Sequence, residues 1–314
     1  MRAIQLEEFG GPDGLRLVEL PDPEAPEGAA VLDVSAAGVN YGDVMQTDNE
    51  YLVPATLPTI PGQEVVGTAP DGRRVVAMVD GGYAEKAVAF GVVTWDVPDA
   101  ISDGQALAVV AQGTTAWHIL RTSAGLREGE TVVVHAAAGG VGSMAVQLAR
   151  RFGAGRVVGL ASTPEKRELV LRLGADAVVD PAEDDLTGAL REANEGRRVD
   201  VVLETVGGRA FEQSLEALAP FGRLVHFGRA SGEPSAPVDP DRLFRMSQSV
   251  IGFWLVHMLR RPDLIAEAIV DLFGAIEAGE IEPVVGGTYP LAEARRAHED
   301  VRARRSTGKL VLVP

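Results

Sequence analysis

Hydrophobic positions follow two different patterns along the chain. In the first third, short runs of β-branched and alternating hydrophobic residues lie between turns rich in glycine and proline, which is typical of a β domain. The clearest runs are AAVLDVSAAGVN (29–40), EVVGTA (64–69), RRVVAMV (73–79) and AEKAVAF (84–90). This part of the chain predicts a barrel-like β fold.

From residue 130 on, apolar strands alternate with amphipathic helices. ETVVVHAAAGG (130–140) predicts a strand that enters a glycine turn, and VGSMAVQLARRFGA (141–154) predicts the helix that follows it. Short apolar strands separated by helices indicate a doubly wound parallel sheet. Further strands are predicted at 156–163, 176–180, 199–208, 223–230 and 249–256, with helices at 164–175 and 210–222.

The C-terminal part predicts one helix, at 260–281, and a closing strand within VRARRSTGKLVLVP (301–314). We expect this strand to return to the β domain. GRASGEPSAPVDPDRL (228–243) has the composition of a loop, and we expect it to border the site.

Composition and charge narrow the possible functions. The chain has 314 residues, enough for two domains, and a formal net charge of −16, which disfavours binding to nucleic acid or to an anionic membrane. It contains no cysteine, which excludes disulfides and thiolate metal sites. The first residues do not resemble a signal peptide, and no apolar run has membrane-spanning length. We expect a cytoplasmic protein.

The stretch HAAAGGVGSMAVQLAR (135–150) has the form of a dinucleotide-binding turn. In such turns the first glycine allows a tight bend, the second lets the backbone approach the pyrophosphate, and the third lets helix and strand pack closely. The three places fall within 137–142, and the first of them holds alanine. The strand before the turn and the helix after it favour anion binding at the helix start over a tight turn without a ligand. The expected contacts are Ala138, Gly139, Gly140, Val141 and Gly142.

The end of the next strand points to NADPH. An NAD site usually has an acidic residue there to bind the ribose hydroxyls. This strand ends instead in Ala161, Ser162 and Thr163, and Lys166 and Arg167 follow. A hydroxyl and a cation suit a 2′-phosphate, and Ser162 and Lys166 are the expected contacts. The alternative role of the hydroxyls is to cap the helix that begins at this point.

Taken together, these motifs resemble the medium-chain dehydrogenase/reductase superfamily, and most closely its zinc-independent quinone oxidoreductases, the ζ-crystallin-like branch. The resemblance covers nearly the whole chain. It rests on AAGVNYGDVMQTDNEY, PTIPGQEVVGTA, QGTTAWHIL, HAAAGGVGSMAVQLAR, LGADAVVD, ETVGG, HFGRASG and TGKLVLVP.

This resemblance implies an α/β protein of two domains. A GroES-like β-barrel catalytic domain is expected at 1–114 and 257–314, and a doubly wound Rossmann domain that binds NADPH at 115–256. The family places the active site in the cleft between these domains. Its members are often dimers or tetramers, commonly joined through the Rossmann sheet, and we expect a homodimer.

Zinc is not expected. Zinc-dependent relatives carry Gly-His-Glu where this chain has Gly62, Gln63 and Glu64, and an amide is a poor zinc ligand. The chain lacks the cysteine ligands, and no pair of its five histidines has helical ligand spacing. His135 and His226 lie on predicted core strands and are expected to be structural.

The resemblance also implies the site residues. Asn40 corresponds to an asparagine near the nicotinamide and substrate, and Asp43 to a mostly structural aspartate. Tyr51 corresponds to a tyrosine facing the substrate, whose phenol can bind a carbonyl oxygen or donate a proton; packing beneath the YLVPATLP loop is the alternative. Pro181 stands where similar NADPH enzymes have a tyrosine that helps to hold the 2′-phosphate. Further implied cofactor contacts are Asn40 itself, Thr115, Thr205, Phe227, Gly228, Ser231, Phe253 and Lys309.

The expected activity is NADPH-dependent reduction of a quinone. Two alternatives stay open. The stretch HAAAGGVG…AVQLAR is also very similar to the enoyl reductase domains of polyketide synthases, which favours an enone or enoyl thioester as acceptor. The second alternative is a non-catalytic protein that binds NADPH, as found among lens crystallins.

Overall fold

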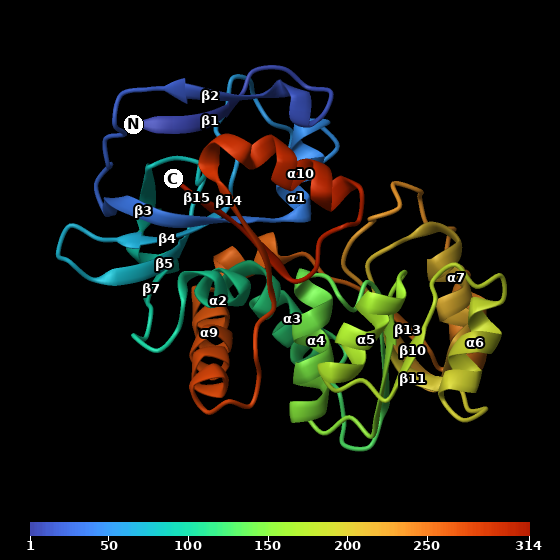
Figure 1. Ribbon diagram of the computed structural model, residues 1–314. Coiled ribbons are helices and arrows are strands. Elements are labelled where there is room, and N and C mark those ends of the chain that lie inside the picture. Colours follow the sequence, from blue (N-terminus) through green and yellow to red (C-terminus); the bar gives the residue numbers. More distant parts are fainter. The chain divides into compact units, whose positions relative to one another are not determined.

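A computed structural model describes residues 1–314 and separates them into two compact units. Unit 1 consists of residues Met1–Gln112 and Leu259–Pro314, so both termini belong to it, and unit 2 consists of residues Gly113–Met258 (Figure 1). The expected boundaries, after residues 114 and 256, differ slightly from these. The catalytic and cofactor roles expected for the two domains remain predictions.

Unit 1 is built mainly of antiparallel strands. Its main sheet has the order β14-β15-β3-β4-β5-β7, with β6 paired to β3, and β1 and β2 form a separate hairpin. The strands are β1 (Arg2–Leu6), β2 (Leu15–Glu19), β3 (Ala29–Val39), β4 (Glu64–Thr68), β5 (Arg74–Met78), β6 (Lys86–Phe90), β7 (Thr94–Asp96), β14 (Val285–Pro290) and β15 (Lys309–Val313). The helices are α1 (Tyr41–Thr47), α2 (Asp103–Leu107), α9 (Pro262–Glu277) and α10 (Ala294–Arg302).

The long strand β3 organises this sheet. Its first part alternates buried Leu32 and Val34 with exposed Asp33 and Ser35, which is the pattern of a strand with one face in the core. Its last four residues are all buried, where β3 pairs with β4 and β15. β15 comes from the end of the chain, so the expectation that the closing strand returns to the β domain is confirmed.

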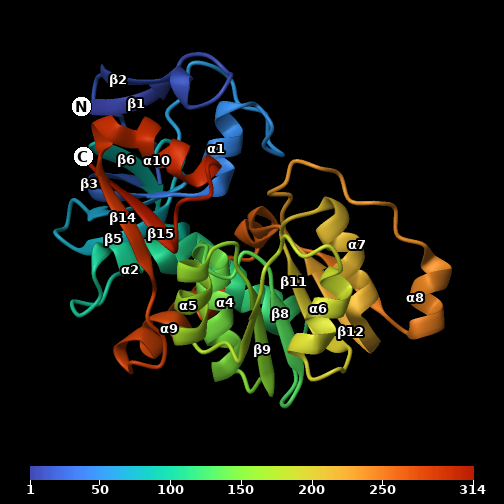
Figure 2. The same cartoon turned by 45° about the vertical axis from the view of Figure 1, so that its right-hand side comes forward.

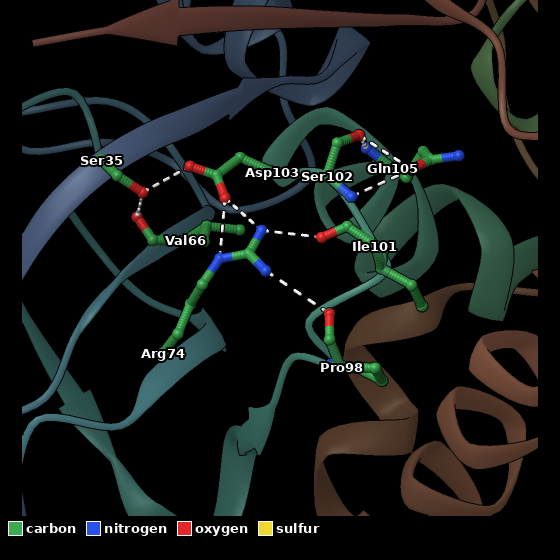
Figure 3. A network of polar contacts seen from close by, with 8 residues as sticks. All are labelled: Ser35, Val66, Arg74, Pro98, Ile101, Ser102, Asp103 and Gln105. Atoms are coloured by element: carbon green, nitrogen blue, oxygen red, sulfur yellow. Dashed lines mark hydrogen bonds and ion pairs between the residues drawn. The ribbon is translucent and has the colours of Figure 1, made fainter. Parts of the chain in front are cut away.

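A polar network fixes the start of α2 (Figure 3). Ser102 and Gln105 form a capping box, with Ser102 N donating to Gln105 Oε1 at 3.0 Å. The Asp103 carboxylate accepts from Ser35 Oγ at 2.6 Å and from Arg74 Nε at 3.0 Å, and Arg74 also donates to the Ile101 carbonyl at 2.8 Å. These bonds tie α2 to β3 and β5. The chain then continues into a segment of π-helix, η3 (Ala108–Gly113).

Unit 2 contains one parallel sheet of six strands in the order β10-β9-β8-β11-β12-β13. The strand order reverses between β8 and β11, which makes their carboxyl ends the topological switch point of a doubly wound sheet. Figure 2 shows β9, β8 and β11 side by side. The strands are β8 (Thr131–Val134), β9 (Arg156–Leu160), β10 (Ala177–Val179), β11 (Val199–Glu204), β12 (Leu218–His226) and β13 (Ser249–Gly252). The helices are α3 (Thr114–His118), α4 (Gly140–Arg151), α5 (Pro164–Arg172), α6 (Leu186–Ala193), α7 (Gly208–Ala217) and α8 (Pro240–Met246).

The predicted order of the strands in unit 2 is confirmed, but α3, before β8, and α6, between β10 and β11, are not predicted. Three further elements differ from the prediction. The helix predicted at 210–222 ends at Ala217, because β12 begins at Leu218, which pairs with Val199 of β11; the pairing resumes at Arg223 after a register irregularity. The loop predicted at 228–243 is interrupted by α8, which Asp239 caps and which has Pro240 in its first turn. The strand predicted at 249–256 ends at Gly252 and is followed by a 3₁₀ segment, η5 (Leu255–Arg260).

None of the helices is both long and apolar enough to span a bilayer.

Candidate functional site

The predicted dinucleotide turn lies at the carboxyl end of β8, where α4 begins. Ala136 has a positive φ of 48°, and the Ala137 amide donates to the Leu160 carbonyl at 2.9 Å, which fixes the turn against β9. The first helical bond of α4 runs from Ser143 N to Gly139 O at 2.8 Å. The three amides before it, those of residues 140–142, therefore have no intrahelical acceptor and are available to an anion.

The two motif glycines have different surroundings. A Cβ on Gly142 would lie 2.2 Å from the Ala136 carbonyl oxygen and 2.7 Å from Ala137 Cα, so only glycine lets α4 pack this close to the turn. A Cβ on Gly139 would meet a single atom, the Ala136 oxygen at 3.2 Å. Gly139 thus borders open space. These are the surroundings that the third and second glycines of a dinucleotide motif need.

The expected 2′-phosphate residues lie at the end of β9. Thr163 caps α5, with its Oγ1 accepting from Lys166 N at 3.3 Å, whereas Ser162 is exposed. Arg167 bonds to the Ala161 carbonyl at 3.1 Å and to the Asp180 carboxylate at 2.8 Å, and so joins the ends of β9 and β10. The capping role considered for the hydroxyls belongs to Thr163. Ser162 and Lys166 remain the predicted phosphate contacts.

A buried carboxylate organises the turns after β11 and β12. Glu204 ends β11, is fully buried, and accepts hydrogen bonds from the amides of Val206 at 2.6 Å and Gly207 at 2.8 Å. Its other oxygen lies 2.6 Å from His226 Nδ1. Burial alone would raise the pKa of Glu204, but the bonds from His226 and the two amides hold this pKa below its ordinary value.

The two histidines predicted on core strands differ from one another. His135 is buried, bonds to Ser214 Oγ at 2.8 Å, and has its pKa lowered by burial. His226 is at the end of β12, has a side chain 31% exposed, and meets Phe211 edge to face. His226 lies on strand β12, as predicted, whereas His135 directly follows β8, and the structural role expected for His226 stays a prediction.

Four further predicted cofactor residues gather beside Glu204. Thr205 follows it, and a Cβ on Gly228 would lie 2.3 Å from Thr205 Oγ1, so the glycine lets the two loops meet. Ser231 Oγ donates to the Val206 carbonyl at 2.6 Å, and the Phe227 amide donates to the Glu204 carbonyl at 3.0 Å. The loops after β11 and β12 are thus joined along the carboxyl edge of the sheet.

The last two predicted cofactor residues of unit 2 lie on other elements. The Phe253 amide donates to the His226 carbonyl at 3.0 Å, and its ring stacks on His118, with ring centroids 6.3 Å apart. Thr115 is largely buried in α3, the same short helix that carries His118.

In unit 1, Asn40 follows β3 and lies at the centre of a polar cluster. Its Nδ2 donates to Glu64 Oε1 at 2.9 Å. Its Oδ1 accepts from Lys309 Nζ at 3.0 Å and from Gln112 Nε2 at 3.2 Å. The cluster joins β3, β4, β15 and the π segment η3.

Lys309 and Glu64 form an ion pair with no solvent exposure. The ammonium also donates to the Val39 carbonyl at 3.4 Å, and the second carboxylate oxygen of Glu64 accepts from the Ala111 amide at 3.0 Å. Sequence analysis assigned Lys309 to the cofactor, and that contact stays a prediction. The structure shows that its ammonium is buried against protein groups.

A second buried group fixes the backbone of Asn40. Asp43 Oδ2 accepts from the Asn40 amide at 2.8 Å and from the Tyr83 hydroxyl at 3.2 Å, and this hydroxyl lies 3.0 Å from His298 Nε2. Burial raises the pKa of Asp43 to about 7 and lowers that of His298 to about 3. Burial also raises the pKa of Tyr83 well above its ordinary value.

Tyr51, the other catalytic candidate, packs over the first turn of α1. A Cβ on Gly42 would lie 3.0 Å from Tyr51 Cε2 and 3.3 Å from Cζ, so the ring rests on this glycine two residues after Asn40. The two exposed residues that follow, Leu52 and Val53, are apolar. The contact with Gly42 supports a packing role for the ring and leaves the function of its hydroxyl as a prediction.

No group of three or more His, Cys, Asp or Glu side chains could hold a metal ion in either unit. Glu64, next to Gln63 in the position of the zinc motif, is used by Lys309 and Asn40 instead.

Comparison with known proteins identifies the family. Residues 140–271 match the family described as zinc-binding dehydrogenase. The chain is 34% identical to the quinone oxidoreductase of Pseudomonas aeruginosa, in an alignment that covers 100% of this chain and 99% of that protein. The chain belongs to the quinone oxidoreductases of the medium-chain dehydrogenase/reductase superfamily.

Solved quinone oxidoreductases have the same fold. The Thermus thermophilus enzyme, also solved in complex with NADPH, is 41% identical with a TM-score of 0.90, over 100% of both chains. The Escherichia coli enzyme, solved in complex with NADPH, is 31% identical with a TM-score of 0.93, again over 100% of both chains. Unit 1 is therefore the GroES-like domain and unit 2 the Rossmann domain of this family.

Sequence reasoning missed several residues of these clusters. Sequence analysis names Glu64 only beside Gln63 in the zinc motif, and it includes Gln112 only as a member of the motif QGTTAWHIL. Glu204 belongs to the ETVGG motif, for which sequence analysis predicts no role of this side chain. The glutamates were recognisable as single acids at the ends of apolar strands, but their partners are far away in the sequence.

Proposed function

We propose that the chain is an NADPH-dependent quinone reductase. The proposal rests on the glycine turn between β8 and α4, whose first helix amides have no intrahelical acceptor, in a chain similar over its full length to quinone oxidoreductases solved with NADPH. NADPH, when bound, supplies the hydride.

The residues of unit 2 fit this cofactor. The amides of residues 140–142 would hold the pyrophosphate, since helix geometry leaves them without an acceptor and Gly139 borders open space. Ser162 and Lys166 would hold the 2′-phosphate, and no acid stands at the end of β9 to favour NAD. Thr205, Phe227, Gly228, Ser231 and Phe253 would line the rest of the groove, joined by the bonds around Glu204.

In unit 1, Asn40 would bind and orient the nicotinamide or the substrate. Tyr51 would hold a proton at its hydroxyl oxygen for transfer to the reduced acceptor. The reaction is proposed to be zinc-independent, because Gln63 occupies the place of the zinc-binding histidine and the chain has no cysteine.

The test is oxidation of NADPH, followed by absorbance, with a panel of quinones and a panel of enones and enoyl thioesters. Turnover of quinones in preference to the other acceptors supports the proposal. Turnover confined to enones or enoyl thioesters would assign the chain to enoyl reduction instead. NADPH binding without turnover of any acceptor would assign it to the crystallin-like class.

We also propose a homodimer. β13 ends the order of the parallel sheet, so one of its edges has no neighbour strand within the chain. An open edge can pair with the same edge of a second copy. Sedimentation equilibrium at micromolar concentration would give twice the chain mass, and a single chain mass at all concentrations would contradict the proposal.

A further inference from the structure

The cluster around Asn40 uses all but one of the hydrogen-bonding groups of its side chain. A primary amide has two N–H donors and one carbonyl oxygen with two lone pairs. Both lone pairs are engaged, by Lys309 and Gln112, and one N–H donates to Glu64. The remaining N–H of Asn40 has no partner in the protein. Asn40 is partly exposed, whereas Glu64 and Lys309 are fully buried.

The orientation of this amide is dictated by charge. Rotating the amide by half a turn would place Oδ1 against the Glu64 carboxylate and the NH₂ group against the Lys309 ammonium. Both contacts would be repulsive, and water does not screen them because neither charged group is exposed. The nitrogen must therefore face Glu64.

The ion pair itself is held in place. Both oxygens of the Glu64 carboxylate have donors, the second from the Ala111 amide at 3.0 Å. A Cβ on Gly38 would lie 2.3 Å from Glu64 Oε1 and 2.6 Å from Lys309 Cε, so β3 has glycine where the pair crosses it. Space for the pair is thus built into the strand that ends at Asn40.

We propose that Lys309, Glu64 and Gln112 are positioning residues that fix Asn40 as a hydrogen-bond donor to a ligand carbonyl oxygen. A fixed N–H donor requires an acceptor on the ligand, which a C=O group supplies and an N–H group does not. Negative charge grows on a carbonyl oxygen as the conjugated system is reduced, and a donor fixed in advance stabilises this charge. The inference rests on the proposed function, and two sources offer this chemistry: a quinone carbonyl and the carboxamide of the nicotinamide.

The positioning role is tested with the paired variant Lys309→Met with Glu64→Gln. It removes both charges at similar side-chain size, so it leaves no unpaired buried charge. The matched control is Lys86→Met with Asp33→Asn, an exposed ion pair at 2.8 Å that joins β6 to β3. In nitrogen-resolved NMR of the free protein, the Asn40 proton that faces Glu64 should resonate downfield, and this shift should be lost in the paired variant only.

Kinetics give the second readout, with 1,4-naphthoquinone as acceptor. Asn40→Ala should lower kcat/KM by about a hundredfold, the loss typical of one donor to a developing oxyanion. The paired variant should lower it by about tenfold or more, while the control changes it by less than about twofold. Equal kcat/KM in the paired variant and the wild type would overturn the positioning role.

Separate titrations distinguish the two carbonyl sources. The unpartnered N–H signal of Asn40 should shift with naphthoquinone alone if it binds the substrate, and with NADPH alone if it binds the nicotinamide. No shift in either titration, with both ligands shown to bind, would overturn the proposal. A protein whose Asn40 signals behave as expected but which reduces no quinone would refute the proposed function alone.

Discussion

At the scale of single residues, two buried groups around Tyr83 have opposite protonation preferences. His298 has its pKa lowered by burial to about 3, so its contribution to stability is present above its ordinary pKa of 6.5 and is lost as pH falls through 3. Asp43 has its pKa raised by burial from 3.8 to about 7, so its contribution is full below pH 3.8 and is lost as pH rises through 7. Between these limits the two contributions oppose each other.

His298→Gln should remove the contribution of His298 to the pH dependence of stability. Relative to wild type, the free energy of unfolding of this variant should rise as pH falls from 7 to 4.5, by about 2 kcal/mol, because the variant no longer excludes a proton on folding. Urea unfolding at the two pH values measures it. His257→Gln, at an exposed histidine, should show no such rise. A pH-independent difference for His298→Gln would contradict the assignment.

Lys166→Glu should change the cofactor preference. A carboxylate near a 2′-phosphate repels it, so KM for NADPH should increase by about tenfold or more, while KM for NADH changes little. Arg172→Glu reverses the same charge at an exposed position of α5 and serves as the control. Equal increases for both cofactors with Lys166→Glu would refute the 2′-phosphate contact.

At the scale of elements, the two glycines of the turn between β8 and α4 are expected to have different roles: Gly142 in packing and Gly139 in ligand binding. Gly142→Ala should lower the free energy of unfolding by about 1 to 3 kcal/mol, because its Cβ would overlap the backbone at Ala136. Gly139→Ala meets one atom at 3.2 Å, so it should leave stability nearly unchanged and weaken NADPH binding. Urea unfolding and NADPH fluorescence titration measure the two effects. Loss of stability without loss of affinity at Gly139 would show that no phosphate approaches there.

The elements that sequence predicted best are those fixed by local pattern. The strand, turn and helix around Gly139 follow from apolar periodicity and glycine spacing. Sequence analysis predicts helix over LAPFG (218–222), which continues the apolar pattern of α7, whereas β12 begins at Leu218, which pairs with Val199 of β11. The polar cluster around Asn40 cannot be predicted from local sequence patterns, for a different reason. Its members come from positions 40, 64, 112 and 309, and only the folded sheet places them together.

At the scale of the whole molecule, unit 1 needs both ends of the chain. β15 lies between β14 and β3, so removing residues 309–314 opens the sheet and leaves Glu64 buried without its cation. In this truncated chain, hydrogen exchange should show lost protection in β3 and β4, with retained protection in β8 and β11, because unit 2 has its own core. Removal of Pro314 alone is the control. Full protection of β3 in the chain that lacks residues 309–314 would contradict the dependence of unit 1 on β15.

The pairing of Glu64 with Lys309 has a consequence for biosynthesis. The carboxylate is made early, and its ammonium partner emerges from the ribosome only after all of unit 2. Unit 2 can therefore fold during translation, at a stage when Glu64 on β4 still lacks its cation Lys309. Asn40 gains its fixed orientation only after β15 has been synthesised, so the polar cluster around it is completed later than the whole of unit 2.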